Sequence, residues 1–178
     1  MNLEFDPPSV ADALAAHRSA IETANVASWR AWMSANLEPA LALSDAEIER
    51  RPSLIAWLFP SGGASRAHPE APVIGRRAMR RLVATDPALQ DSLARAFDRM
   101  VAELGLEERQ GALCWQAQPQ RWAAARQRDW RVYRMLRCVH NAGLEARARM
   151  LMAFLEQELG GDPARAEALS WFRHQVAS

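Results

Sequence analysis

The sequence contains no lysine, so all 22 residues counted as Lys or Arg are arginines. Arginine carries a planar guanidinium fork that binds carboxylate and phosphate groups. A protein that binds acidic groups would have this composition, and a GC-rich coding bias produces it too; we favour the coding bias. The formal net charge is only +1, so binding to nucleic acid or to an anionic membrane would depend on a local basic surface.

Long apolar runs and cysteine pairs are also scarce. No segment approaches the roughly 18 apolar residues that a membrane-spanning helix requires. The start of the chain, M-N-L-E-F-D-P-P, has neither the basic beginning nor the apolar block of a signal peptide. Cys114 and Cys138 are the only cysteines, and we expect two free thiols in a reducing compartment. We therefore expect a cytoplasmic protein without a membrane span.

Strand patterns are missing as well. Threonine, valine and isoleucine are scarce, and no stretch of five or more residues combines alternating apolar and polar side chains with enrichment in β-branched residues. The length of 178 residues is that of one ordinary domain. We predict an all-α fold in which residues 1–178 form a single compact domain of about six or seven helices.

Apolar residues at helical spacing, together with caps and stop residues, indicate where these helices lie. The stripe of Val10, Leu14, His17 and Ile21 predicts a first helix with a partly buried histidine, ending near Asn36 ahead of a proline. Residues 61–74 and 106–119 are expected to be irregular connections. Further helices are expected to begin at Ser44, where Pro52 makes the helix short or kinked ahead of a further turn or two at Leu54, and at Gly75, Asp86, Trp122, Leu144 and Asp162.

The segment from Trp122 to Gly143 carries both a core pattern and the most distinctive charge pattern. Its apolar face has the i, i+3, i+4, i+7 spacing of a buried helix: Val132, Met135, Leu136 and Val139. Beside that face, arginine recurs every third residue: Arg128, Arg131, Arg134 and Arg137.

Two interpretations of this arginine row stay open. With the aromatic residues beside it, the row suits phosphate or carboxylate groups, including those of single-stranded nucleic acid. Alternatively, Arg131 and Arg134 point inward and pair with an acidic side chain or with the carbonyls that end the helix before Pro60. We favour the inward arrangement, because the net charge provides no supporting basic surface.

Catalytic and ligand-binding motifs are not evident. The sequence has neither the spacing of a metal site nor a glycine-rich phosphate cradle, and the four histidines stand in different expected elements. We expect no metal and no cofactor. The least improbable catalytic group combines His140 with Asp129 or Glu145, and a protein without enzymatic activity is the favoured interpretation.

Four motifs in order carry a family resemblance. They are I-A-W-L-F-P at 55–60, S-R-A-H-P-E-A-P at 65–72, R-M-V-A-E-L-G-L at 99–106, and R-V-Y-R-M-L-R at 131–137 followed by G-L-E at 143–145. Together they resemble the signatures of the opioid growth factor receptor conserved domain, over residues 40–157. Ala56 and Tyr133 replace a glutamine and a threonine of the family pattern, and R-Q-R-D at 126–129 replaces a tetrad rich in histidine and asparagine.

The resemblance implies a helical domain. Animal members of the family are described as receptors for an enkephalin-type peptide at the nuclear envelope. The arginine- and alanine-rich composition suggests a bacterial-type member, for which the family implies no assigned activity, and peptide-hormone binding is not transferred to it.

We therefore expect a helical interaction domain, without enzymatic activity, that binds a protein or peptide partner. The alternative is an anionic ligand or nucleic acid bound by the helix at Arg128–Arg137. The residues expected to form the contact surface are Trp57, Phe59, Trp130, Arg131, Arg134 and Arg137.

Overall fold

The computed structural model describes residues 10–65, 68–116, 126–162 and 166–177, with side chains for all of these except 10–16, 126–129 and 177. Within these ranges the chain forms eight helices and a two-stranded antiparallel sheet. The predominantly helical fold is thus confirmed, whereas the purely all-α prediction is wrong. The helices are α1 (Val10–Leu41), α2 (Asp45–Glu49), α3 (Pro52–Leu58), α4 (Arg76–Thr85), α5 (Pro87–Glu103), α6 (Arg126–Asn141), α7 (Glu145–Leu159) and α8 (Ala166–Ala177). The strands are β1 (Leu106–Arg109) and β2 (Ala112–Trp115).

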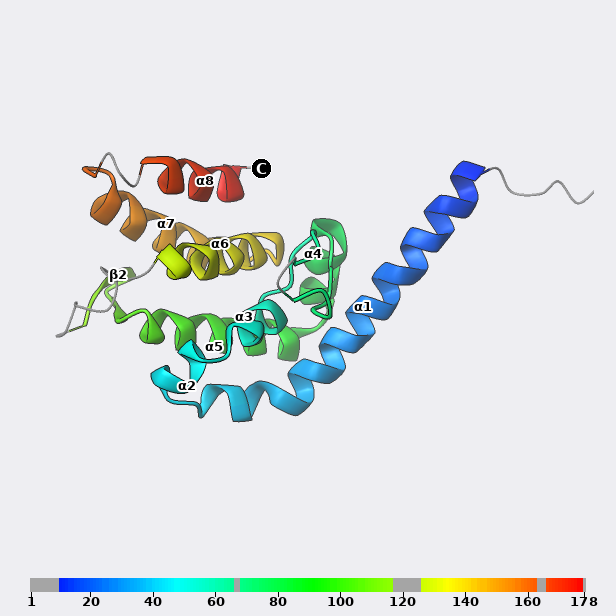
Figure 1. Ribbon diagram of the computed structural model, residues 1–178, viewed down its shortest axis with the longest axis horizontal. Coiled ribbons are helices and arrows are strands. Elements are labelled where there is room, and N and C mark those ends of the chain that lie inside the picture. Colours follow the sequence, from blue (N-terminus) through cyan, green and yellow to red (C-terminus); the bar gives the residue numbers. More distant parts are fainter. Residues whose placement is uncertain (1–9, 66–67, 117–125, 163–165, 178) are drawn as a thin grey trace, which may run out of the picture.

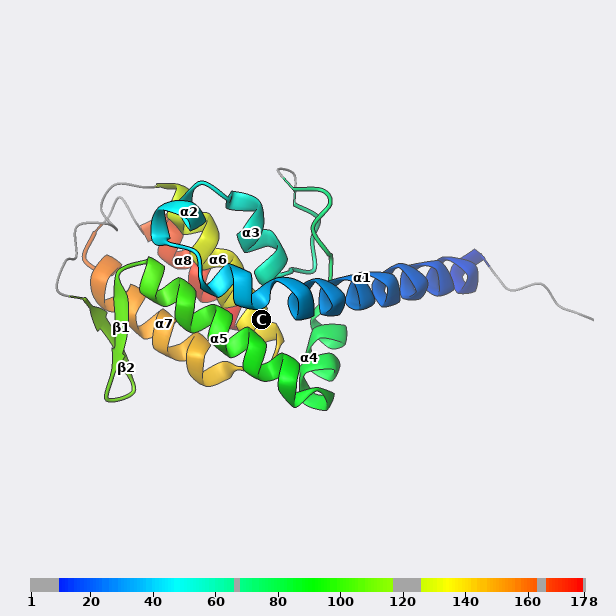
Figure 2. The same cartoon turned by 90° about the horizontal axis from the view of Figure 1, so that it is seen from below.

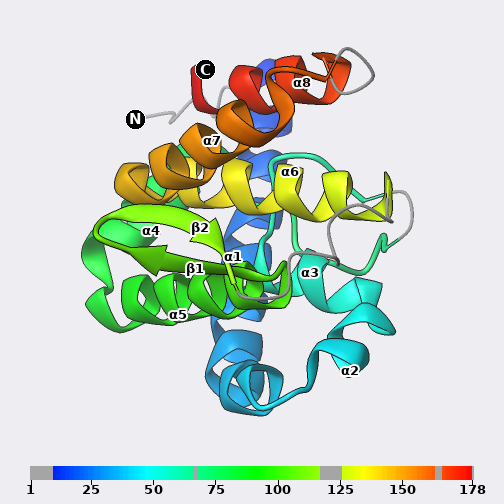
Figure 3. The ribbon, with the colours of Figure 1, turned by 90° about the vertical axis from the view of Figure 1, so that its left-hand side faces the viewer.

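The body of the molecule is built on α5, α6, α7 and α8, which lie across it one above another (Figure 1). Helix α6 packs against both α7 and α8, while α5 packs against α1 and α4. Seen from the end of the body, the hairpin lies in front of these helices and contacts α7 (Figure 3). None of the described helices combines the length and the apolar character needed to cross a bilayer.

The core follows the predicted apolar stripes. On α6, the side chains at positions 132, 135, 136 and 139 are completely buried. On α5, the apolar residues at helical spacing from Leu89 to Val101 form a second buried stripe, and Asp86 caps this helix by accepting a hydrogen bond from the Leu89 amide at 3.1 Å. Both stripes were found because a long amphipathic helix repeats its apolar spacing over several turns.

The first helix runs past its predicted end. Helix α1 continues through Pro39 to Leu41 instead of stopping near Asn36. Contacts with α5 hold this last turn in place, because Arg95 donates to both carboxylate oxygens of Glu38, at 2.7 and 3.0 Å. The neighbouring Ala40 is buried. Tertiary packing therefore outweighs the local preference against a proline in a helix.

The other half of α1 extends away from the body, as Figures 1 and 2 both show. The stripe expected to be buried there is not buried: His17 is exposed, and Ile21 is 49% exposed. The side chains of Val10 and Leu14 lie outside the described set. The stripe was misassigned because helical spacing shows that a helix is amphipathic and does not show what covers its apolar face.

The predicted irregular connection after α5 is a β-hairpin over its first ten residues. Arg109 pairs with Ala112, so Gln110 and Gly111 form a two-residue turn, with φ of 54° and 80°. Two positive φ values are characteristic of a type I′ turn, whose twist matches that of the strands. Each strand has four residues, which is shorter than the alternation that the sequence analysis required.

Candidate binding site

Arg131 on α6 is buried and connects three helices. Its Nη1 donates to Oε1 of Glu103 on α5 at 3.1 Å, and its Nη2 donates to the carbonyl of Glu49 at 3.1 Å. The side chains of Arg131 and Glu103 are 5% and 2% exposed. Glu49 is the last residue of α2, and the carbonyls at a helix C-terminus favour a nearby cation.

Arg134 makes an equivalent contact one turn further along α6. Its Nε donates to the carbonyl of Phe59 at 3.2 Å, and Phe59 is the C-cap of α3. The guanidinium carbon also lies 5.8 Å from the ring centroid of Trp130. Burial lowers the pKa of Arg134, and an arginine starts so far above neutrality that it keeps its charge. These contacts of Arg131 and Arg134 match the inward arrangement favoured from the sequence.

The rest of the arginine row differs. Arg137 is partly exposed, and its Nη1 donates to the hydroxyl of Tyr133 at 2.8 Å. Its guanidinium lies 6.0 Å from the centroid of the same ring, so the tyrosine holds the arginine in one orientation. The side chain of Arg128 lies outside the described residues. Among the described members of the row, Arg137 is therefore the one that reaches the surface.

The six residues expected to form a contact surface divide between core and surface. Phe59, like the two buried arginines, has almost no exposed area. Trp57 and Trp130 are partly exposed, and Trp57 stacks on Trp32 with 5.4 Å between the ring centroids. The structure thus brings α3 and α6 together as expected, but it leaves only Trp57, Trp130 and Arg137 accessible.

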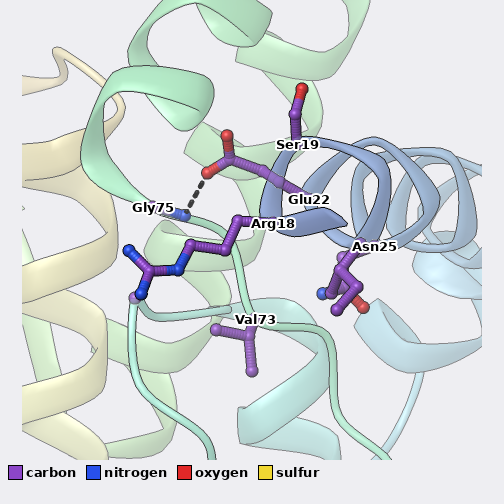
Figure 4. Close-up of a pocket in the computed structure, with 8 residues that line it drawn as sticks. Arg18, Ser19, Glu22, Asn25, Val73 and Gly75 are labelled. Atoms are coloured by element: carbon purple, nitrogen blue, oxygen red, sulfur yellow. Dashed lines mark hydrogen bonds between the residues drawn. The ribbon is translucent and has the colours of Figure 1, made fainter. Parts of the chain in front are cut away.

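A cleft of about 720 Å³ opens between α1 and the segment that joins α3 to α4. In Figure 4, Arg18 and Asn25 extend from α1 toward the segment that carries Val73. The cleft has charged, amide and aliphatic groups on its walls. They belong to Arg18, Ser19, Ile21, Glu22 and Asn25 of α1 and to Gly62, Val73 and Gly75 of the connecting segment.

Glu22 joins the two walls of this cleft. Its Oε1 accepts a hydrogen bond from the amide of Gly75 at 3.2 Å, drawn as the dashed line in Figure 4. Gly75 is the N-cap of α4, so the carboxylate lies at the positive end of that helix. A Cβ atom added to Gly75 would lie only 2.8 Å from the same oxygen. The glycine therefore permits this close approach.

Arg137 adjoins the cleft from α6. A Cβ atom added to Gly62 would lie 3.8 Å from its Nη2, so the guanidinium lies against the backbone of a cleft residue. The arginine that was predicted as a contact residue thus stands beside the cleft, together with Arg18 from α1.

Helix α4 begins at the cleft and carries four exposed arginines: Arg76, Arg77, Arg80 and Arg81. One of them, Arg80, pairs with Glu145 through a distance of 2.6 Å. The pKa of the neighbouring His140 is lowered, first by burial and then by the positive charge of Arg76. Within the described chain, Nε2 of His140 is buried without a hydrogen-bond partner.

The suggested catalytic group is present only in part. Glu145 and His140 lie close enough for the carboxylate to oppose the lowering of the histidine pKa. The carboxylate is held by Arg80, however, and the side chain of Asp129 lies outside the described residues. Over the part of the chain that is described, histidine, cysteine and acidic side chains form no group of three able to hold a metal ion.

Sequence reasoning did not find the cleft, because its walls are separated by about forty positions and belong to no motif. The available signals were Arg18 and Glu22, which interrupt a stripe expected to be buried. Comparison with models of known protein families, with curated proteins and with solved structures gave no match. The resemblance to the opioid growth factor receptor domain therefore stays a prediction.

Proposed function

We propose that this chain is a helical interaction domain without enzymatic activity, and that it binds a segment of a protein or peptide partner in the cleft beside α1. The cleft is the observation that carries the proposal. Aliphatic groups of Ile21 and Val73 line it together with the hydrogen-bonding groups of Arg18 and Asn25. Binding pockets commonly combine apolar walls with a few placed polar groups.

The free half of α1 supports the same function. It extends beyond the body (Figure 2), and Ile21 projects with about half of its area exposed. Exposed apolar side chains next to a cleft supply contact area for a partner.

The arginine row at Arg128–Arg137 offers less support for an anion-binding function. Arg131 and Arg134 use their guanidinium groups within the fold. Arg137 is partly exposed and belongs to the cleft side of α6. We therefore place the contact surface at the cleft and include Arg137 in it.

Selection from a library of random peptides displayed on phage tests this proposal. Enriched peptides are resynthesised, and their affinity is measured for the full chain and for Ser19→Trp. Ser19 is exposed and lines the cleft, so an indole placed there obstructs the cleft without entering the core. We expect affinity to fall about tenfold or more, which is 1.4 kcal/mol.

Ala24→Trp is the matched control, because Ala24 is exposed on the same helix and is not a cleft-lining residue. This variant is expected to bind like the unmodified chain. Failure to enrich any peptide, or equal binding by Ser19→Trp and Ala24→Trp, would overturn the proposal.

A further inference from the structure

We infer that the cleft binds an acidic peptide segment, and that the exposed face of α4 continues the cleft as a basic track for that segment. This inference rests on the proposed peptide-binding function and adds the chemistry of the ligand. Its evidence is the charge and the continuity of the surface from α1 through the cleft to α4.

The charge of the chain is unevenly distributed. Six arginines surround the cleft and α4: Arg18, Arg76, Arg77, Arg80, Arg81 and Arg137. With the carboxylates of Glu22 and Glu145, this region has a formal charge of +4. The whole chain has a charge of +1, so the remaining sixteen arginines and nineteen acidic residues give −3. The small net charge therefore conceals a strongly basic surface, which attracts an anionic partner.

The basic groups form one continuous surface. Gly75 is both a wall of the cleft and the N-cap of α4, and Arg76 and Arg77 follow it in the first turn of the helix. On the other side of the cleft, Arg137 lies against Gly62. The pKa of His140 is lowered mainly by burial and then by the positive charge of Arg76, so the charge of α4 contributes only part of this shift. A bound segment can therefore pass from the cleft onto α4 with arginines along its path.

The composition of the cleft favours a peptide over nucleic acid. Sites for single-stranded nucleic acid combine basic residues with aromatic rings on which bases stack. The cleft instead places the aliphatic side chains of Ile21 and Val73 beside its arginine, and its eight described lining residues include no aromatic ring. A segment that alternates carboxylate and aliphatic side chains complements both features.

Glu22 adds a specific expectation. Its carboxylate already accepts the Gly75 amide hydrogen at the wall of the cleft, so it repels a second carboxylate nearby. Glu22→Gln keeps an acceptor oxygen for this amide and removes the negative charge. This variant is expected to bind an acidic peptide several-fold more tightly than the unmodified chain.

The test uses four probes of equal length, titrated by fluorescence anisotropy at low and moderate salt. They are a peptide of alternating Glu and Leu, its Gln and Leu counterpart, poly-glutamate, and single-stranded DNA. We expect the Glu and Leu peptide to bind with the highest affinity. This affinity should fall about tenfold from low to moderate salt, because screening reduces attraction between exposed charges. Poly-glutamate is expected to bind more weakly, since it lacks aliphatic groups.

Matched charge variants locate the site. Arg76→Gln with Arg77→Gln removes two charges from α4. Arg50→Gln with Arg149→Gln removes two exposed charges elsewhere, one directly after α2 and one on α7. The first pair of substitutions is expected to reduce the affinity for the Glu and Leu peptide about tenfold. The second pair is expected to change that affinity less than about twofold. Circular dichroism checks that both double variants stay folded.

The possible outcomes distinguish a failure of this inference from a failure of the proposed peptide-binding function. If the Glu and Gln peptides bind equally well and both bind Ser19→Trp more weakly, the preference for an acidic peptide is wrong. The proposed peptide-binding function would still stand. Preferential binding of DNA, or equal effects of the two charge variants, would overturn the inference as well. If no peptide binds at all and phage selection also fails, both proposals are wrong.

Discussion

The Nε of Arg134 donates a hydrogen bond to the carbonyl oxygen of Phe59 at 3.2 Å, so a side chain of α6 binds the C-cap carbonyl of α3. One turn away, Arg131 donates in the same way to the last residue of α2. A row of arginines that resembles a binding surface in the sequence is therefore partly a set of internal contacts. Among the exposed arginines of the described residues, Arg18 lies at the cleft and Arg76, Arg77, Arg80 and Arg81 lie on α4.

Replacing Arg134 by methionine tests its structural role. Met retains most of the aliphatic stem and removes the donor, so the buried Phe59 carbonyl loses its partner. We expect the free energy of unfolding to fall by about 1–3 kcal/mol, measured by urea denaturation. Arg149→Met is the control, because Arg149 is exposed, and it should change stability by less than about 0.5 kcal/mol. Similar effects of the two variants would argue against the structural role.

The buried pair of Arg131 and Glu103 gives a second prediction. Arg131→Met leaves the Glu103 carboxylate buried without this partner, and we expect a loss of about 3–5 kcal/mol in the free energy of unfolding. The double variant Arg131→Met with Glu103→Leu should lose clearly less than the single variant, because it removes the buried carboxylate together with its arginine partner. A double variant as unstable as the sum of the two single variants would show that the pair is not coupled.

The hairpin turn allows a comparison of two glycines. A Cβ atom added at Gly111 or at Gly63 meets no atom within 4 Å, but only Gly111 has a positive φ, of 80°. Gly111→Ala is therefore expected to destabilise the protein by about 1–2 kcal/mol through backbone strain alone. Gly63→Ala should be neutral or slightly stabilising. Equal melting temperatures for the two variants would contradict the type I′ turn.

The elements that were predicted correctly are those with a repeated local pattern. The core faces of α5 and α6 show the helical spacing over several turns, so packing and local preference agree. The hairpin was missed because its strands have four residues and its turn is Gln-Gly, whereas Asn-Gly and Asp-Gly are the common signals. The end of α1 was missed because burial of Leu37 and Ala40 in the core accompanies the continuation of the helix through Pro39, and local sequence does not show this packing.

The candidate site was less predictable than the fold. The inward contacts of Arg131 and Arg134 were one of two open interpretations, because the sequence does not show which carbonyls α6 faces. The cleft depends on the angle between α1 and the segment that carries Val73 and Gly75. Such an arrangement follows from tertiary packing, and neither periodicity nor a motif encodes it.

The two cysteines should differ in reactivity. Cys138 is completely buried, and burial raises the pKa of its thiol to about 12. Cys114 is partly exposed. Because the thiolate is the reactive form, a disulfide reagent near neutral pH should modify only Cys114 in the native protein and both cysteines in urea. Cys114→Ser should abolish the native reaction; rapid labelling of Cys138 in that folded variant would contradict its burial.

Backbone amide NMR of the labelled chain, titrated with the alternating Glu and Leu peptide, tests most directly where the protein binds its partner. We expect the largest chemical-shift changes at Arg18, Glu22, Gly75 and Arg76, with little change in the hairpin or α8. Changes centred instead on Trp57 and Trp130 would contradict binding at the cleft and would favour the contact surface that was expected from the sequence.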